Sequence, residues 1–189
     1  MSGRRADQTG TAPPAAACED PIVAQHREAK DTRRATGEHE LHVRLLAEAE
    51  LAVILPLIRT LNPDIPPTVL AARLDDMRKN GYQCAGVFAG GRCVAVAGLW
   101  FGTRFWCGRY VDIDNVVVDE SWRGRGIGRL LLDWVEAYAR RQGCEKAVLD
   151  AYVTNGPAHA FYVRRGYRIV GFHFDKDLRG SGDPPGAIP

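Results

Sequence analysis

The chain has 189 residues, of which 46% are hydrophobic, which suits one well-packed domain and is too short for two large ones. Its 25 Lys and Arg residues nearly balance 23 Asp and Glu residues, so the formal net charge of +2 creates no broad field that attracts nucleic acid or anionic lipid. We therefore expect a protein that binds neither nucleic acid nor membranes, and any basic site must be local.

The cysteines and the chain ends indicate where the protein resides. The five cysteines are odd in number, widely spaced and never arranged as CxxC, so we expect reduced thiols and no bound metal. The first residues, MSGRRADQTG, lack a signal-peptide core, and the longest apolar stretch, residues 51–58, is too short to span a membrane, which predicts a cytoplasmic protein. Composition predicts a disordered tail at residues 1–38, a domain at 39–178 and a flexible tail at 179–189.

In chain order, the first predicted elements are a short strand at residues 42–46 and a helix at residues 48–61. Pro56 should kink this helix or divide it in two. Thr68 is a suitable N-cap for a second, amphipathic helix, which Gly81 would end in a left-handed conformation.

A β-hairpin and a further strand are predicted next. Residues 82–89 and 93–103 have the composition of strands, and Gly90-Gly91 between them tolerates the positive φ angles of a tight turn. Residues 110–118 follow as another strand.

The clearest helical pattern in the chain lies downstream and ends at Gly143. Its apolar residues recur at helical spacing: Ile127, Leu130, Leu131, Trp134, Val135 and Tyr138. Residues 147–153 then predict a strand, 157–165 a short helix stopped by Gly166, and 167–174 a final strand. The resulting order, β-α-α-β-β-β-α-β-α-β, indicates a mixed α/β sheet.

The stretch VVVDESWRGRGIGRLLL joins the strand at 110–118 to this strong helix through a glycine-rich loop. Glycines let the backbone approach a ligand closely, and the N–H groups and dipole at a helix start attract negative charge. Arg123, Arg125 and Arg129 add positive charge, so the loop suits a phosphate or pyrophosphate. It is neither a P-loop, which needs GxxxxGK, nor a dinucleotide fingerprint, because Arg129 stands at the last glycine position of GxGxxG.

The loop resembles a known acetyl-CoA motif. Its R-x-x-G-x-G pattern, from Arg123 through Gly126 to Gly128, is similar to [QR]-x-x-G-x-[GA] of the GNAT superfamily, although the pattern alone also suits a ligand-free surface turn. The downstream segment NGPAHAFYVRRGY looks like the second GNAT motif, N-x-x-A-x-x-[FL]-Y-x-x-x-G-[FY]. Its matching residues are Asn155, Ala158, Phe161, Tyr162, Gly166 and Tyr167. The two motifs occur in the family's order and spacing, so the resemblance covers residues 41–178.

The resemblance implies the GNAT fold, a mixed central sheet with splayed parallel central strands flanked by helices. It also implies an acetyl-CoA-dependent N-acetyltransferase, in which a primary amine attacks the thioester directly in a ternary complex. The splayed strands would be residues 110–118 and 147–153, with the pantetheine arm of acetyl-CoA in the gap between them.

The same resemblance assigns residues to the co-substrate acetyl-CoA. The backbone of Val116, Val117 and Val118 would contact the pantetheine arm, and one of these N–H groups would polarise the thioester carbonyl. The pyrophosphate would be bound by Arg123, Gly124, Arg125, Gly126, Ile127, Gly128 and Arg129. Asn155 would bond the pantetheine, or it would cap the helix that follows, a role equally natural for this residue type.

The catalytic candidates also follow from the resemblance. Tyr162 matches the tyrosine that in many relatives protonates the departing thiolate, and a phenol suits that role, although it is also a common core residue. The amine must lose a proton, and relatives place an acidic base at positions that correspond to Asp150, Asp112 or Asp114. Each of these carboxylates would serve equally well as an ordinary strand residue or as a contact to a cationic substrate.

The acceptor remains the least specified part of the prediction. Relatives form its site from the two N-terminal helices and nearby loops, which here include residues 61–67 and the aromatic residues Trp100, Phe101, Phe105 and Trp106. We favour core or dimer packing for these aromatics over a role in an acceptor pocket. A small-molecule amine and a protein amine both suit the chemistry, and relatives are often homodimers.

Two other functions compete with the enzyme. A catalytically inactive acetyl-CoA-binding sensor or regulatory module would keep the glycine loop without turnover, against which Tyr162 and the carboxylates argue. A nucleic-acid-binding domain would use the Arg-rich turn, but the near-neutral charge disfavours it.

Overall fold

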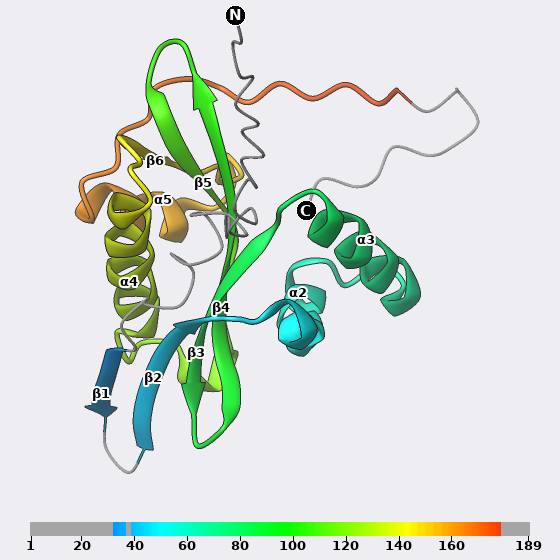
Figure 1. Ribbon diagram of the computed structural model, residues 1–189, viewed down its shortest axis with the longest axis vertical. Helices are drawn as coiled ribbons and strands as arrows, with labels where there is room; N and C mark the ends of the chain where they lie inside the picture. The colour runs from blue at the N-terminus through cyan, green and yellow to red at the C-terminus, as the bar shows by residue number, and fades with distance from the viewer. Residues whose placement is uncertain (1–31, 37–38, 179–189) are drawn as a thin grey trace, which may run out of the picture. The chain divides into compact units, whose positions relative to one another are not determined.

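The computed structural model describes residues 32–36 and 39–178, and within them a six-stranded sheet forms the centre of the domain (Figure 1). Its strands are β1 (Thr32–Thr36), β2 (His39–Leu45), β3 (Gln83–Ala89), β4 (Arg92–Arg104), β5 (Gly108–Val118) and β6 (Lys146–Val148). They lie side by side in chain order, with antiparallel neighbours up to β5 and a parallel pair between β5 and β6. The predicted mixed sheet is confirmed.

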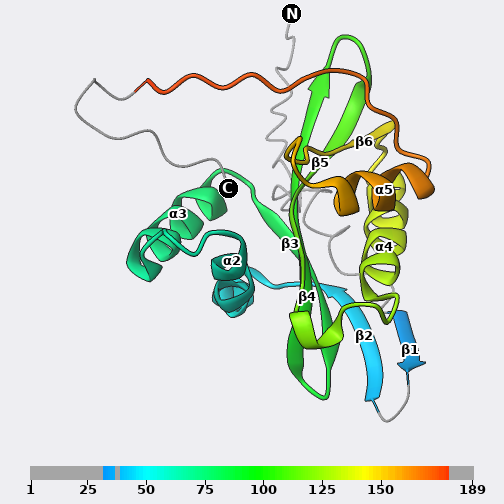
Figure 2. The same cartoon turned by 180° about the vertical axis from the view of Figure 1, so that it is seen from behind.

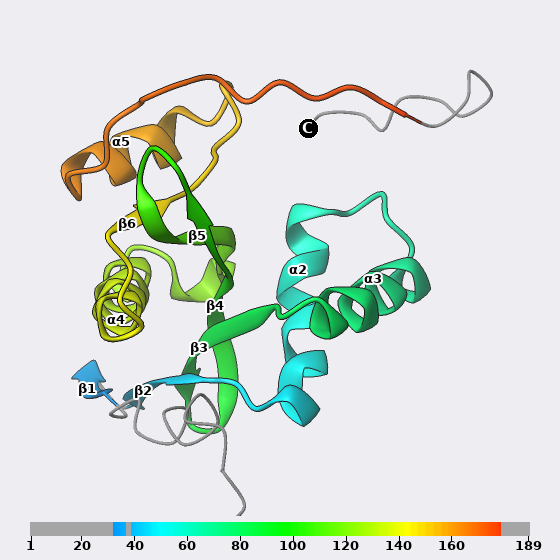
Figure 3. The same cartoon turned by 45° about the horizontal axis from the view of Figure 1, so that its top comes forward.

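Helices cover the two faces of this sheet. They are the 3-10 helix η2 (Glu48–Ile54), α2 (Leu55–Leu61), α3 (Pro67–Lys79), the 3-10 turn η3 (Glu120–Trp122), α4 (Ile127–Arg141) and α5 (Gly156–Arg164). The two views from front and back place α2 and α3 on one face and α4 on the other (Figures 1 and 2). Viewed with its top forward, the sheet separates α4 from α2, and α5 lies near β6 (Figure 3).

The apolar periodicity of α4 explains its position. All six residues of the predicted apolar face are at most 8% exposed: Ile127, Leu130, Leu131, Trp134, Val135 and Tyr138. On the opposite face of the sheet, Leu51, Ile54 and Leu57 pack with Val96 and Val117. Apolar side chains are thus buried on both sides of the sheet, and this burial stabilises the position of β5 between the two layers of helices.

The N-terminal half agrees with the sequence prediction except at two points. Pro56 lies in the first turn of α2, directly after η2, so the predicted division of the helix in two is confirmed. Proline is tolerated there because an N–H group in the first turn has no hydrogen-bond partner within the helix. Thr68 is not an N-cap, because α3 begins at Pro67 and its N-cap residue is Pro66. The ring of Pro67 fixes a φ angle that suits the first residue of a helix. Residues 32–36, expected within an unstructured tail, instead pair with β2, whose outer edge would otherwise be open.

The C-terminal half contains the main differences. The strand expected at residues 147–153 is only the three residues of β6, and residues 167–174 form no strand. Ile169, Val170, Phe172 and Phe174 are 75–89% exposed. A segment with strand propensity forms a strand only when another strand is available to pair with it. β6 has only three residues, so it offers a following strand little backbone for pairing.

None of the helices among the described residues is both long and apolar enough to cross a membrane.

Candidate active site

The centre of the site is the point where β5 and β6 separate. The two strands pair only at Tyr110 with Lys146, Val111 with Ala147 and Asp112 with Val148. β5 continues to Val118, whereas the chain after Val148 leaves the sheet. The predicted splay of the parallel strands is therefore confirmed, and it leaves Val116, Val117 and Val118 along an edge that β6 does not cover.

A β-bulge lies in β5 beside this gap and was not predicted. Val96 pairs with Val117 and Gly98 with Asp114, so β5 has one more residue than β4 between these pairs. Asn115 takes up the extra residue at a φ angle of 50°, the left-handed region that asparagine tolerates better than most residues. The bulge bends β5 between the carboxylates that precede it and the valines that follow it. The signal in the sequence was Asn115, a residue type that is uncommon in strands.

The glycine-rich loop has an open backbone. Gly124 and Gly126 have φ angles of 74° and 76°, and a Cβ atom built on either one would meet no atom of the described residues within 4 Å. Gly126 is the N-cap residue of α4, and no described side chain caps this helix end. Ile127, the first residue of α4, is 1% exposed and belongs to the core. The first N–H groups of a helix have no partner within it, and anion binding at this helix start stays a prediction.

The three arginines of the loop already make contacts within the chain. The Nε of Arg123 donates a hydrogen bond to the carbonyl of Val118 at 3.2 Å. The guanidinium of Arg125 lies 5.1 Å from the centre of the Trp122 ring, and Arg129 pairs with Asp133 at 3.7 Å. These contacts keep positive charge around the open backbone.

The second motif lies against the first. A Cβ atom on Gly128 would make ordinary van der Waals contacts with Phe161 at 3.5 Å and Val118 at 3.7 Å, so this glycine lies near both α5 and the end of β5. The side-chain oxygen of Asn155 accepts a hydrogen bond from the N–H of Ala158 at 3.2 Å. The helix-capping role of Asn155 is therefore confirmed, and it occupies only the oxygen of the carboxamide.

Tyr162 lies on α5 among other aromatic rings. Its ring centre is 5.4 Å from that of Phe161 and 5.8 Å from that of Tyr167. Burial raises the pKa of the Tyr162 phenol above its usual value. The phenol is therefore protonated throughout the neutral range and is able to donate a proton.

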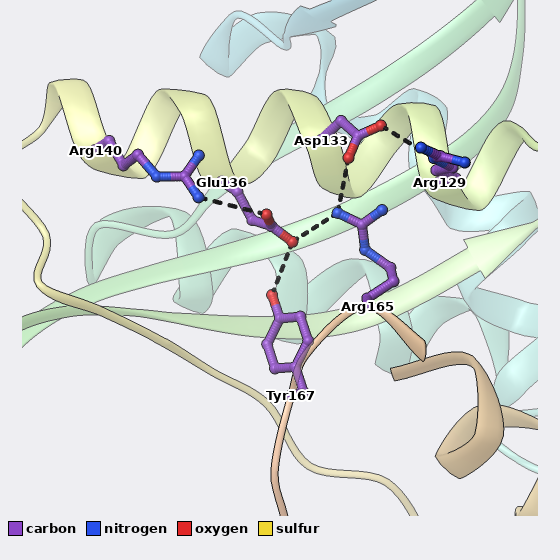
Figure 4. A network of polar contacts seen from close by, with 6 residues as sticks. All are labelled: Arg129, Asp133, Glu136, Arg140, Arg165 and Tyr167. Atoms are coloured by element: carbon purple, nitrogen blue, oxygen red, sulfur yellow. Dashed lines mark hydrogen bonds and ion pairs between the residues drawn. The ribbon is translucent and has the colours of Figure 1, made fainter. Parts of the chain in front are cut away.

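An ion-pair network, which the sequence did not reveal, joins α5 to α4 (Figure 4). The guanidinium of Arg165 lies 2.8 Å from Asp133 and 2.7 Å from Glu136, and its side chain is only 11% exposed. The hydroxyl of Tyr167 also donates to Glu136, at 3.4 Å, and Arg140 approaches the same carboxylate at 3.7 Å. The network fixes the helix that carries Tyr162 relative to the helix that begins at the glycine loop.

A pocket of about 250 Å³ opens on the same part of the sheet. It is lined by Trp100 of β4, by Asp112, Ile113 and Asp114 of β5, and by Asp150, which follows β6. The structure thus brings together all three carboxylates that the sequence singled out. The predicted contribution of residues 61–67 is not found among the lining residues.

The carboxylates of this pocket influence one another. Burial raises the pKa of Asp112, and the negative charges of Asp150 and Asp114 raise it further, against the opposing effect of Arg104 at 3.7 Å. Burial also raises the pKa of Asp114, although hydrogen bonds from Asn115 and Trp100 act in the other direction. Asp150 is exposed and binds the imidazole of His173, with 2.9 Å between Oδ2 and Nδ1.

The aromatic residues near the hairpin have different roles. Trp100 lines the pocket and also packs against Tyr82, with 5.3 Å between the ring centres. Phe101 packs edge-on against Tyr138 of α4, as a core residue should. Phe105 and Trp106 at the hairpin end are exposed. Trp100 also packs against the core cluster, so core packing is found for both Phe101 and Trp100, and an acceptor role for Trp100 stays a prediction.

Comparison with known proteins establishes the family. The sequence model of the acetyltransferase (GNAT) family matches residues 54–167. The chain belongs to the GNAT family. This GNAT chain is 35% identical over 136 residues to a glucosamine 6-phosphate N-acetyltransferase of Trypanosoma brucei brucei, a match that covers 68% of the chain and 90% of the relative.

Solved structures agree with this assignment. A Trypanosoma brucei acetyltransferase is 31% identical and matches 73% of the chain and 99% of its own length, with a TM-score of 0.58. An aminoglycoside N-acetyltransferase solved in complex with CoA has the same fold, with a TM-score of 0.66 at 16% identity, over 77% of the chain and 99% of its own. The GNAT fold and an acyltransferase activity are thereby established for this chain.

GNAT acetyltransferases use acetyl-CoA, and the residues of this chain fit that molecule. The open space at Gly124 and Gly126 leaves room for a phosphate group beside the backbone. The uncovered edge of β5 offers main-chain groups to an extended ligand. In the part of the chain that the structure describes, no group of three or more His, Cys, Asp or Glu side chains is arranged to hold a metal ion.

Proposed function

We propose that the chain transfers the acetyl group of acetyl-CoA to the primary amine of a small molecule, which attacks the thioester directly in a ternary complex. The observation that carries this proposal is the position of the acidic pocket. Its walls include Ile113 and Asp114, which directly precede the bulge at Asn115 and the valines of the uncovered edge. An amine held in the pocket would therefore lie beside the place where the acetyl group is expected.

Acetyl-CoA would supply an acetyl group activated as a thioester. The backbone of Val116, Val117 and Val118 would hold the pantetheine arm, and the carboxamide nitrogen of Asn155 would donate to it. The loop from Arg123 to Arg129 would hold the pyrophosphate through its N–H groups and guanidinium charges. With both molecules fixed, most of the rate enhancement would come from their alignment.

The pocket would bind the acceptor through charge. Asp112, Asp114 and Asp150 attract an ammonium group, and the ring of Trp100 provides an aromatic surface for it. Arg104, the nearby cation, is paired with Asp112. An amine with several positive charges therefore suits this pocket better than an amine that carries a phosphate.

The names of similar proteins support a small-molecule acceptor. The similar enzymes include a blasticidin-S acetyltransferase of Streptomyces morookaense and an aminoglycoside N(6')-acetyltransferase of Stenotrophomonas maltophilia.

Proton movement would involve the residues around the pocket and α5. The Oη of Tyr162 would protonate the departing sulfur, because burial keeps the phenol protonated. The carboxylates would hold the acceptor as an ammonium until it loses a proton to a base.

The experiment is a thiol-release assay with acetyl-CoA and three amines, namely an aminoglycoside, spermidine and glucosamine 6-phosphate, alongside calorimetric titration with acetyl-CoA. We expect turnover with at least one of the two polycations in preference to the phosphorylated sugar. Gly126→Glu should abolish acetyl-CoA binding by repelling the pyrophosphate. Gly126→Ala is its matched control, because it carries the same backbone strain without the charge.

The outcomes separate the competing functions. Acetyl-CoA binding without thiol release from any amine would favour the inactive sensor over the enzyme. Equal binding by Gly126→Glu and Gly126→Ala would contradict the assigned pyrophosphate site.

A further inference from the structure

His173 is a titratable residue beside the pocket that neither GNAT motif contains. It lies in the extended segment 167–178, which pairs with no strand among the described residues. The side chains on either side of it, Phe172 and Phe174, are 78% and 89% exposed. The imidazole, in contrast, forms a specific contact, because its Nδ1 lies 2.9 Å from Oδ2 of Asp150.

Two observations place this imidazole at the pocket. Asp150, its partner, is one of the lining residues. A positive charge on His173 also lowers the pKa of Asp112 on the opposite wall, so the ring lies within electrostatic reach of both carboxylates. His173 therefore extends the acidic pocket with a residue that is able to accept a proton.

The carboxylate fixes the chemistry of the ring. When Asp150 accepts a hydrogen bond from Nδ1–H, the neutral ring carries its lone pair on Nε2. This arrangement orients a histidine as a base and stabilises the imidazolium that forms when it takes a proton. Besides Asp150, the charged group that interacts with the ring is Asp112, which is itself paired with Arg104.

We propose that His173 is the general base of the reaction and that Asp150 is its positioning residue, an inference that rests on the proposed acetyl transfer. The bound ammonium gives one proton to Nε2 of His173, and the freed nitrogen lone pair forms the C–N bond to the acetyl carbon. The C–S bond breaks with its electron pair on sulfur, which takes a proton from Tyr162. The nitrogen of the new C–N bond then loses a second proton, which passes through solvent to the Tyr162 phenolate. His173, whose side chain is 68% exposed, releases its proton to water.

An imidazole suits this step better than a carboxylate does. Carboxyl groups ordinarily titrate near pH 4 and imidazoles near about pH 6.5, so the imidazole is the better match to an ammonium. The raised pKa values of Asp112 and Asp114 reduce this difference, but these groups are also needed to hold the charge of the acceptor.

The test compares the pH profile of kcat/KM for wild type, His173→Gln and Asp150→Asn with the best polycation of the panel. His159→Gln, a half-buried histidine of α5, is the matched control. We expect His173→Gln to lower kcat/KM about a hundredfold at neutral pH and to remove the acidic limb of the profile. Asp150→Asn should keep that limb with a lower maximum, and acetyl-CoA binding measured by calorimetry should be unchanged in both variants.

Chemical rescue distinguishes a base from a structural residue. Added imidazole should restore part of the activity of His173→Gly and none of the activity of Asp150→Asn. A His173→Gln variant with a wild-type profile and a rate within threefold would overturn this inference while leaving the proposed function intact. A wild-type protein that acetylates no amine would overturn the proposed function and this inference with it.

Discussion

The guanidinium of Arg165 lies 2.7 Å from the carboxylate of Glu136, and this ion pair connects the helices that carry the two GNAT motifs (Figure 4). Asp133 accepts from the same guanidinium at 2.8 Å. The glycine loop at the start of α4 and Tyr162 on α5 belong to elements that are distant in sequence. We infer that their relative position depends on this network.

Replacing Arg165 with alanine should lower both stability and acetyl-CoA affinity. Its side chain is 11% exposed and that of Glu136 is 19% exposed, so removal of the cation leaves a largely buried carboxylate without its strongest partner. We expect a loss of about 2 kcal/mol in urea unfolding, below the value for a fully buried pair because Asp133 is exposed. Arg140→Ala is the control, since that arginine is 71% exposed and 3.7 Å from Glu136. Equal losses in the two variants would contradict the special role of Arg165.

Gly98 is required because Tyr82 approaches it closely. A Cβ atom at this position would lie 2.6 Å from the Tyr82 hydroxyl and 3.0 Å from the carbonyl of Asp114, beside the bulge. Gly98→Ala should therefore cost about 1–3 kcal/mol in thermal or urea unfolding and should distort the pocket. Gly156→Ala adds the same methyl group where no described atom lies within 4 Å, and it should be nearly neutral. A neutral Gly98→Ala would show that Tyr82 moves aside freely.

The buried carboxylate of Asp114 should reduce stability at neutral pH. Burial raises its pKa in the folded state, so the folded protein binds a proton more tightly than the unfolded chain does. Stability from this group is therefore greatest at acidic pH and falls as the pH rises through the folded pKa. Asp114→Asn should raise the Tm at pH 7 and leave it nearly unchanged at pH 4, while lowering activity. A variant with a lower Tm at pH 7 would contradict this expectation, and Asp64→Asn, at an exposed position, serves as the control.

The sequence predicted elements whose pattern is local. The apolar face of α4 and the Gly90-Gly91 turn, with φ angles of 54° and 84°, follow from nearby residues alone. The Arg165 network and the pocket wall formed by Trp100 join side chains that are distant in the chain. The local spacing of apolar residues therefore could not predict them. The strand expected at residues 167–174 failed for the same reason, because its pattern suits a strand but the fold provides no partner for it.

Tyr162→Phe tests the proton donor directly. The variant keeps the ring and its contacts with Phe161 and Tyr167 but removes the hydroxyl, so kcat should fall about ten- to a hundredfold while acetyl-CoA binding is retained. An acid is active below its pKa, and burial raises the pKa of Tyr162, so loss of this proton should lower the wild-type kcat as the pH rises into the alkaline range. The variant should lack this basic limb when kcat is measured from pH 6 to 10. Tyr167→Phe, which loses a hydroxyl contact to Glu136 instead, should keep the limb. If Tyr162→Phe retains kcat within twofold and the same limb, the proton that reaches the sulfur comes from another donor.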